Sequence, residues 1–253
     1  MERITSRTNP LCTHLRKLGA SASYRRREGQ FLCDSPKLVE EALRWSPDCV
    51  RVIVCTEGMD FPTVPAGIRL VEVPGEVMES VSPAKTPQGM LAICSMPKRS
   101  LPARLEGRHY VLLDGVQDPG NVGTVLRTAD AFWVDGVFMV NGCADLYSPK
   151  TLRASMGAVF RCPAWSAELS DVVELLRESE IPLYGAALRD DTLDAREVNY
   201  DRVAVAIGSE GHGLSREALE LCSRTIKIPM REHCESLNAA AAATVLLWEM
   251  SKG

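Results

Sequence analysis

The chain of 253 residues carries 29 lysine and arginine residues against 33 aspartate and glutamate residues, so its formal net charge is −4. This balance excludes a protein that coats nucleic acid through bulk charge, although a local basic patch remains compatible with it. No apolar run reaches the ~18–20 residues that a membrane helix needs, and we expect no membrane partner.

The cysteines and histidines indicate a reducing compartment and no metal. The nine cysteines form no CxxC pair, their number is odd, and most lie in apolar stretches, where cysteine behaves as a small hydrophobic residue. The first ten residues lack the apolar core of a secretory signal. We therefore expect free thiols and a cytoplasmic location. The four histidines show no zinc-type spacing.

The first 30 residues are the basic part of the chain. Seven arginine and lysine residues oppose two glutamates there, a net charge of +5. A solvated helix face followed by a charged turn would account for this composition. We favour the alternative, an anionic partner held by phosphate contacts.

A short alternation of helices and strands follows. Helices are predicted at residues 36–45, which open with proline, and 75–81, and strands at 50–55, 68–73 and 88–94. These elements predict a small α/β domain over residues 1–98. Residues 99–108 contain proline and charged residues without periodicity, which is typical of a linker.

A second α/β domain is predicted over residues 109–253. Its strands are expected at 110–116, 136–142, 182–188, 203–209 and 225–230, and its helices at 121–132, 149–157, 168–179, 215–222 and 236–250. Strands that are apolar on both faces and alternate with helices predict a mostly parallel sheet covered on both sides. Ligands of such sheets bind beyond the carboxyl ends of the strands, so the loops there are the candidate sites.

The loop after the first of these strands reads QDPGNVGTVLRTADAF, residues 117–132. Asn121 lies near the start of a helix, where free N–H groups favour an anion or a polar ligand, but a helix cap is an alternative role. Arg127 projects from a largely apolar helix, and an arginine in that setting needs a partner such as a phosphate or carboxylate.

The loop GSEGHGLS, residues 208–215, has three glycines within six residues, which permits close approach of a ligand to the backbone. Glu210 within it would either cap a helix or present a carboxylate to a partner. The order of glycines is not that of a dinucleotide-binding fingerprint.

The third stretch, IPMREHCESLNAAAAATVLLWEM, covers residues 228–250. Its adjacent His233, Cys234 and Glu235 point in different directions and have no second ligand pair, which disfavours both a metal site and a cysteine nucleophile. We expect a helix to begin near Ser236, with Ser236 or Glu235 at its cap.

These three stretches together resemble the ordered motifs of the SpoU/TrmH family of RNA ribose 2′-O-methyltransferases, in the SPOUT class. The stretch LYSPKTLRASMGAVFRCP, residues 146–163, fits the same family. The resemblance covers about residues 110–250. The N-terminal part resembles the family's substrate-binding domain, which has the shape of ribosomal protein L30e.

The resemblance implies S-adenosylmethionine as cofactor, bound in a C-terminal trefoil knot, and a homodimer whose active site lies near the subunit interface. By motif position, the cofactor residues would be Gly208, Glu210, Gly211, Gly213, Ile228, Met230 and Leu237. The catalytic and substrate positions would be Asn121, Arg127, Glu210, Ser236 and Asn238. The substrate would be structured RNA, with ribosomal RNA expected first and transfer RNA second, and the RNA-binding residues would be Arg7, Arg16, Lys17, Arg25, Arg26, Arg27, Lys150 and Arg153.

The roles of these residues follow from the chemistry of methyl transfer to a ribose hydroxyl. The enzyme must align the acceptor hydroxyl and provide for the loss of its proton. A guanidinium stays protonated far above neutral pH, so we expect Arg127 to hold the target phosphate and to stabilise developing negative charge. Glu210 would orient a neighbour such as Arg127 or Asn121. A phosphate oxygen or water would accept the proton.

Two positions depart from the family pattern, because Glu232 and Trp133 stand where many members have glycine. Trp133 is expected to serve in packing, whereas Glu232 would reshape the cofactor loop. An RNA-binding module without catalysis is the alternative from another class, and the intact catalytic positions argue against it. A nucleotide-binding enzyme of unrelated chemistry is disfavoured because no GxGxxG or P-loop motif is present.

Overall fold

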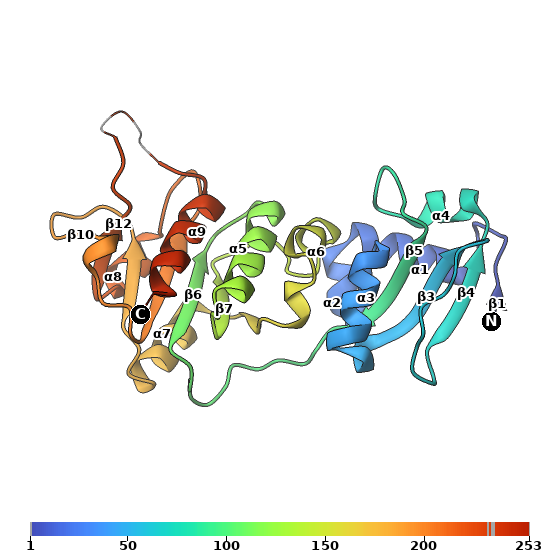
Figure 1. The fold of residues 1–253 in the computed structure, drawn as a ribbon, viewed down its shortest axis with the longest axis horizontal. Coiled ribbons are helices and arrows are strands. Elements are labelled where there is room, and N and C mark those ends of the chain that lie inside the picture. The colour runs from blue at the N-terminus through green and yellow to red at the C-terminus, as the bar shows by residue number, and fades with distance from the viewer. Residues whose placement is uncertain (1, 232, 234–235, 253) are drawn as a thin grey trace. The chain divides into compact units, whose positions relative to one another are not determined.

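The computed structural model describes residues 2–231, 233 and 236–252, and groups the chain into two compact units. Unit 1 contains Met1–Lys98 together with Asp145–Phe160, and unit 2 contains Arg99–Ala144 and Arg161–Gly253 (Figure 1). The chain thus returns once to unit 1 between the two parts of unit 2. The sequence analysis placed the returning segment in the second domain. Glu232, Cys234 and Glu235 lie outside the described residues.

Unit 1 is built on a five-stranded mixed sheet of order β1-β4-β3-β5-β2, in which β5 runs antiparallel to both neighbours. The strands are β1 (Glu2–Arg3), β2 (Gln30–Cys33), β3 (Val50–Thr56), β4 (Arg69–Val73) and β5 (Met90–Ser95). The helices before the returning segment are α1 (Pro10–Ala20), α2 (Ala22–Glu28), α3 (Pro36–Trp45) and α4 (Gly75–Val81). Both predicted helices and all three predicted strands of this region are confirmed, each to within two residues.

The helix ends of unit 1 follow from local sequence. The hydroxyl of Ser35 accepts a hydrogen bond from the backbone N–H of Leu38, and Pro36 occupies the first turn of α3, where a missing N–H costs nothing. Helix α2 ends at Gly29, whose φ of 61° is the left-handed conformation that glycine adopts readily.

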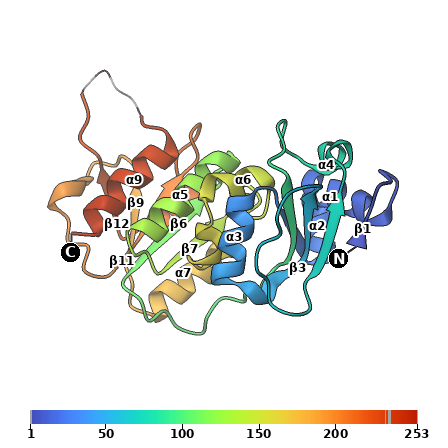
Figure 2. The same ribbon diagram turned by 45° about the vertical axis from the view of Figure 1, so that its right-hand side comes forward.

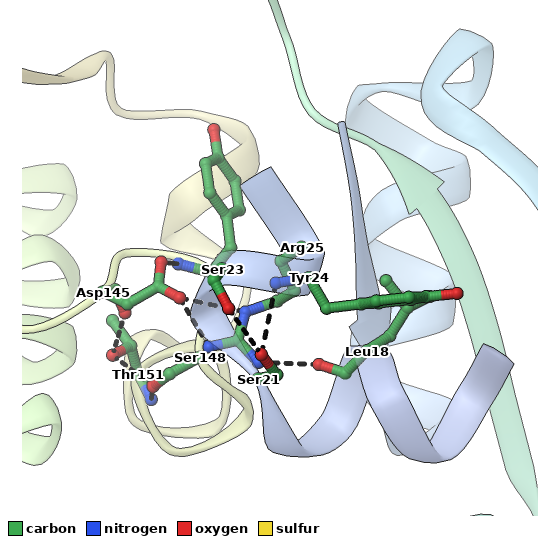
Figure 3. Close-up of polar contacts among 9 residues, drawn as sticks. Leu18, Ser21, Ser23, Tyr24, Arg25, Asp145, Ser148 and Thr151 are labelled. Carbon is green, nitrogen blue, oxygen red and sulfur yellow. Dashed lines mark hydrogen bonds and ion pairs between the residues drawn. The ribbon is translucent and has the colours of Figure 1, made fainter. Parts of the chain in front are cut away.

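The returning segment, which contains α6 (Pro149–Ser155), is held in unit 1 by aromatic and ionic contacts. The ring of Phe31 lies 4.7 Å from that of Tyr147 and 6.2 Å from that of Phe160, measured between centroids. The guanidinium of Arg25, only 3% exposed as a residue, pairs with the carboxylate of Asp145 (Figure 3). Its Nη1 also donates to the carbonyl oxygen of Leu18 at 2.6 Å. These contacts explain why a segment distant in sequence belongs to unit 1.

Unit 2 contains a seven-stranded sheet of order β10-β12-β9-β11-β6-β7-β8, and every neighbouring pair is parallel. The strands are β6 (His109–Asp114), β7 (Gly136–Val140), β8 (Ala164–Ser166), β9 (Leu183–Ala186), β10 (Leu193–Asp194), β11 (Val203–Gly208) and β12 (Arg224–Lys227). The helices are α5 (Pro119–Ala131), α7 (Leu169–Glu178), α8 (Arg216–Leu221) and α9 (Ala239–Met250). The predicted parallel sheet is confirmed.

Helices cover this sheet as its apolar strands require. Side chains of α7 and α8 form one core with those of β6, β7, β9 and β11. Helices α5 and α9 pack against each other and contact β7 and β11 respectively, and both views show them side by side (Figures 1 and 2). No helix among the described residues is long and apolar enough to cross a membrane.

The alternative cap role for Asn121 and the predicted helix start near Ser236 are both wrong. Helix α5 is capped by Asp118, whose carboxylate accepts from the backbone N–H of Asn121, so Asn121 is not itself the cap. Helix α9 begins at Ala239 rather than near Ser236, because the side chain of Asn238 accepts from two backbone N–H groups of its first turn. An amide oxygen at this position satisfies donors that would otherwise remain unpaired.

Candidate active site

A cavity of about 630 Å³ lies at the carboxyl ends of β9, β11 and β12 in unit 2. It is lined by residues 186–188, 207–210, 213, 226–231, 236, 237, 239, 242 and 246, among those that the structure describes. This is the edge at which ligands bind to parallel sheets, and the volume falls within the usual ~300–1,000 Å³ of ligand pockets.

The cavity gathers most of the residues expected to hold the cofactor. Six of the seven line it, namely Gly208, Glu210, Gly213, Ile228, Met230 and Leu237, together with Ser236 from the catalytic set. Gly211 is the exception and lies outside the lining. The sequence analysis missed Leu188, Ile207 and Leu246, which add apolar wall. Leu188 follows β9, so the rule that points to loops after strands would have found it.

The loop between β11 and α8 is closed at its base. The N–H of Ser209 donates to the carbonyl oxygen of Gly213 at 3.0 Å, and the N–H of Gly213 donates to the carbonyl oxygen of Ser209 at 2.9 Å. A Cβ atom on Gly208 would lie 2.0 Å from the carbonyl carbon of Gly213. Any residue other than glycine would therefore clash with the backbone at this position. Gly208 therefore serves close packing of this loop on its own backbone, whereas Gly213 supplies a left-handed φ of 65°. Glu210 sits at the exposed tip of the loop.

Three of the expected catalytic side chains form one hydrogen-bonded chain. The amide Nδ2 of Asn121 donates to Oε1 of Glu210, and its Oδ1 accepts from Nδ2 of Asn238 at 3.2 Å. Asn238 is itself held by the first turn of α9, since its Oδ1 accepts from Ala240 N at 3.0 Å. The three residues come from α5, the loop after β11 and the start of α9, so tertiary folding alone brings them together. Of the two neighbours considered for Glu210, Arg127 and Asn121, its carboxylate contacts Asn121.

Arg127 does not join this chain. It lies six residues after Asn121 on α5, which places it ~9 Å further along the helix axis and on a different side. Its side chain is exposed, and within the described residues its guanidinium has no hydrogen-bond or ion-pair partner. The described residues thus leave Arg127 available to a further partner.

An apolar surface surrounds Arg127. Along α5 and α9 the exposed positions include Ala131, Ala241, Val245 and Trp248, and Trp248 is 52% exposed. Helix α9 is apolar on nearly all sides, and such helices are normally buried all round.

The expectation that Trp133 serves in packing is wrong, because it is 79% exposed.

Trp133 adopts a φ of 54°, the left-handed conformation that favours glycine. This backbone geometry accounts for the glycine that stands at the position in many members of the resembled family.

All eight residues expected to bind RNA lie in unit 1. Arg7, Lys17, Arg26, Arg27, Lys150 and Arg153 are exposed, and Arg16 is half-buried. Arg25 differs from these residues because it is buried. Its guanidinium donates to the carboxylate of Asp145 and to the carbonyl oxygen of Leu18. Lys17 and Arg27 lie over the ring of Tyr24, at 5.4 and 4.7 Å from its centroid.

Arg153 pairs with Asp34, whose side chain is fully buried. Burial raises the pKa of the Asp34 carboxyl, and the positive charge of Arg153 opposes that rise. Among the described residues, Oδ1 of Asp34 has no hydrogen-bond partner. Arg153 therefore has one structural contact, although 42% of its side chain remains exposed for another.

Comparison with known proteins places this site in a family. The SpoU rRNA methylase family matches residues 108–248, and the MRM3-like substrate binding domain matches residues 9–92. The chain is 33% identical over 251 residues to a 23S rRNA guanosine 2′-O-methyltransferase of Bacillus subtilis, with 99% of each chain covered. It is also 33% identical to a tRNA/rRNA methyltransferase of Synechocystis, over 97% of this chain and 92% of the relative.

A solved structure agrees with these sequence matches. The rRNA methyltransferase of Sinorhizobium meliloti with bound AdoMet superposes with a TM-score of 0.88, at 30% identity and over 99% of this chain and 97% of the other. The chain therefore belongs to the SpoU rRNA methylase family, and the resemblance found in the sequence is confirmed. The class of enzyme is the RNA 2′-O-ribose methyltransferase that uses S-adenosylmethionine.

The cavity fits this cofactor. Its apolar walls suit an adenine ring, and backbone groups of Gly208 and Gly213 suit polar recognition. Lys227 and Arg231 supply positive charge for a carboxylate, while Glu210 supplies negative charge for a cation.

Proposed function

We propose that this protein methylates the 2′-hydroxyl of a ribose in ribosomal RNA. The observation that carries the proposal is the hydrogen-bonded chain Glu210–Asn121–Asn238 beside a cavity of cofactor size. The relative from Bacillus subtilis, matched over its whole length, acts on 23S rRNA by name and supports ribosomal RNA as the substrate.

The hydrogen-bonded chain is suited to hold the acceptor ribose. S-adenosylmethionine supplies a methyl group on a positively charged sulfur. Asn121 and Asn238 each have donors and acceptors that can align a hydroxyl, and Glu210 keeps the amide of Asn121 in one orientation. Ser236, two residues before Asn238, lines the cavity. The hydroxyl proton passes to a phosphate oxygen or to water.

Arg127 acts on the substrate phosphate and stabilises the negative charge that develops on the attacking oxygen. In this proposal it reaches the active site of a second subunit, which is consistent with its exposed position and its distance along α5 from Asn121. The homodimer forms through the α5 and α9 surface, where Ala131, Val245 and Trp248 are exposed. The family's trefoil knot is formed by the stretch from β11 to α9, which also lines the cavity.

Unit 1 holds the RNA. The exposed side chains of Arg7, Lys17, Arg26, Arg27 and Lys150 supply phosphate contacts, with contributions from Arg16 and Arg153. Arg25 is left out, because its charge is already neutralised by Asp145. The cytoplasm is the proposed location, supported by the eight free thiols among the described residues.

Methyl transfer measured with labelled S-adenosylmethionine tests the proposal. Ribosomal RNA from a strain that lacks this protein should accept label, whereas RNA from the parent strain, already modified, should not. Ribose methylation should be mapped across total RNA of both strains. Loss of a single site in 23S or 16S rRNA is expected. Loss confined to transfer RNA would instead favour the second substrate class, and no loss anywhere would contradict the proposed activity.

A further inference from the structure

Asp114 is a buried carboxylate that none of the proposed catalytic steps uses. It is the last residue of β6 and only 2% exposed. In the sheet it lies opposite Gly208 of β11 on one side and Val140 of β7 on the other. It therefore sits at the carboxyl edge of the sheet, directly beside the start of the loop that carries Glu210.

Both oxygens of Asp114 are engaged. Oδ2 accepts from the backbone N–H of Ser215 at 2.6 Å, and Oδ1 accepts from Nδ2 of Asn141 at 2.7 Å. Asn141 has a φ of 52° and its Nδ2 is also 3.4 Å from the hydroxyl of Ser215. A buried carboxylate costs free energy unless it is hydrogen-bonded. The burial of Asp114 is therefore compensated by both donors, the N–H of Ser215 and the amide of Asn141.

Ser215 is the far end of the loop that begins at Gly208. Because Ser209 and Gly213 exchange backbone hydrogen bonds, residues 209–213 are closed into one piece of backbone. The placement of that piece is then determined by its two ends. One end continues from β11, and the other is tied to β6 through the bond from Ser215 to Asp114.

We propose that Asp114 is a positioning residue, which fixes the 208–215 loop so that Gly208 and Gly213 line the cofactor cavity and Glu210 reaches Asn121. Asn141 holds the Asp114 carboxylate in the required orientation. The inference rests on the proposed function for the identity of the ligand. The link between Asp114 and the loop is independent of it.

The first experiment compares Asp114→Ala with Asp114→Asn in the full chain. The alanine leaves the N–H of Ser215 unpaired, whereas the asparagine oxygen still accepts from it, and its amide can donate to a turned Asn141. For Asp114→Ala we expect the Kd for S-adenosylmethionine, measured by calorimetry, to rise about tenfold, as expected for an unpaired buried donor. Asp114→Asn should restore binding to near that of the unchanged protein.

A matched control exists in Asp135, which precedes β7 and contacts the opposite end of β6 from Asp114. Asp135 also accepts backbone hydrogen bonds, from the N–H groups of Arg108 and His109 at 2.7 and 2.9 Å. Asp135→Ala should leave the Kd unchanged. If Asp114→Ala behaves like Asp135→Ala, the proposal is overturned.

Amide hydrogen exchange of the cofactor-free protein gives a readout that does not depend on the ligand. Peptides covering residues 209–215 should exchange faster in Asp114→Ala than in the unchanged protein, while peptides from α7 should not change. Equal exchange in the loop would overturn the proposal. Failure of the unchanged protein to bind S-adenosylmethionine would instead count against the proposed function.

A second pair of variants tests the same bond if Asp114→Ala does not fold. The φ of Ser215 is −59°, which proline adopts, so Ser215→Pro removes the donor without requiring a new φ at that residue. Ser215→Ala removes the same helix-capping hydroxyl and keeps the N–H. We expect weaker cofactor binding for the proline variant than for the alanine variant. Equal Kd values would overturn the proposal.

Discussion

Replacement of Arg25 by alanine should destabilise unit 1 rather than weaken RNA binding through lost surface charge. Arg25 belongs to the run Arg25–Arg26–Arg27, and its two neighbours are exposed. The side chain of Arg25 is 4% exposed and that of Asp145 is 19% exposed (Figure 3). The three arginines are adjacent in sequence, yet one is part of the protein interior.

The magnitude follows from what the variant leaves behind. Arg25→Ala removes the two donors to Asp145 and the donor to the carbonyl oxygen of Leu18. An unpaired buried charge costs about 3–5 kcal/mol, and the residual exposure of Asp145 places this case near the lower end, at about 3 kcal/mol. Asp145 also accepts from Tyr147 N at 3.0 Å, so the position of the returning segment is affected as well.

Urea unfolding followed by tryptophan fluorescence measures this effect, because Trp45 lies in unit 1. The matched control is Arg26→Ala, which should change the free energy of unfolding by no more than about 0.5 kcal/mol. The double variant Arg25→Ala/Asp145→Ala removes both charges, and we expect it to lose less stability than the two single variants combined.

Arg26→Ala should lower RNA affinity and reduce the dependence of binding on salt, since it removes a solvated charge. Arg25→Ala should leave that salt dependence unchanged at temperatures where it is folded. The interpretation of Arg25 is refuted if Arg25→Ala unfolds at the same urea concentration as Arg26→Ala and loses the same salt dependence.

Four further predictions concern the site, the surface and the pH dependence of stability. Arg127→Ala should lower methyl transfer about 10²–10³-fold while the Kd for S-adenosylmethionine stays unchanged, and wild-type turnover would contradict its role. Gly208→Ala should abolish cofactor binding by calorimetry because its Cβ meets the Gly213 backbone, whereas Gly211→Ala, with no atom within 4 Å of its Cβ, should bind normally. Trp248→Lys should yield monomers in sedimentation experiments, and a persistent dimer would exclude the α5–α9 surface. The raised pKa of the buried Asp34 means that its stabilising contribution is complete below its ordinary value of 3.8 and is lost as the pH rises through the folded-state value. Asp34→Asn should therefore raise the melting temperature at pH 7 by an amount that vanishes in acid, and a lower melting temperature at pH 7 would disprove this.

The elements of both units could be predicted because their signals are local. Helix α3 begins with a serine cap and proline, and strands such as β6 and β11 are continuous apolar runs that only a doubly covered sheet can bury. The motif loops were equally local, since each follows directly after a strand. These features depend on neighbours within a few residues along the chain.

The roles of single residues could be predicted less well. Asn121, Glu210 and Asn238 were identified by motif, but Arg25 was grouped with Arg26 and Arg27 because adjacent arginines look alike in sequence. Trp133 was expected to pack because tryptophan usually does, and its left-handed backbone was not visible in the sequence. Burial and φ depend on the surrounding fold, which a motif does not encode.

The sequence by itself therefore determined the class of fold, the family and the loops that carry the chemistry, because hydrophobic periodicity and turn residues act over short distances. Only the tertiary structure decided that residues 145–160 belong to unit 1 and that Arg25 is paired inside it. It also brought the Asp114 carboxylate against the backbone N–H of Ser215, at the end of the loop that carries Glu210. The Asp114–Ser215 and Arg25–Asp145 bonds join residues 101 and 120 positions apart, because a buried charge takes its partner from the folded interior wherever that partner lies in the sequence.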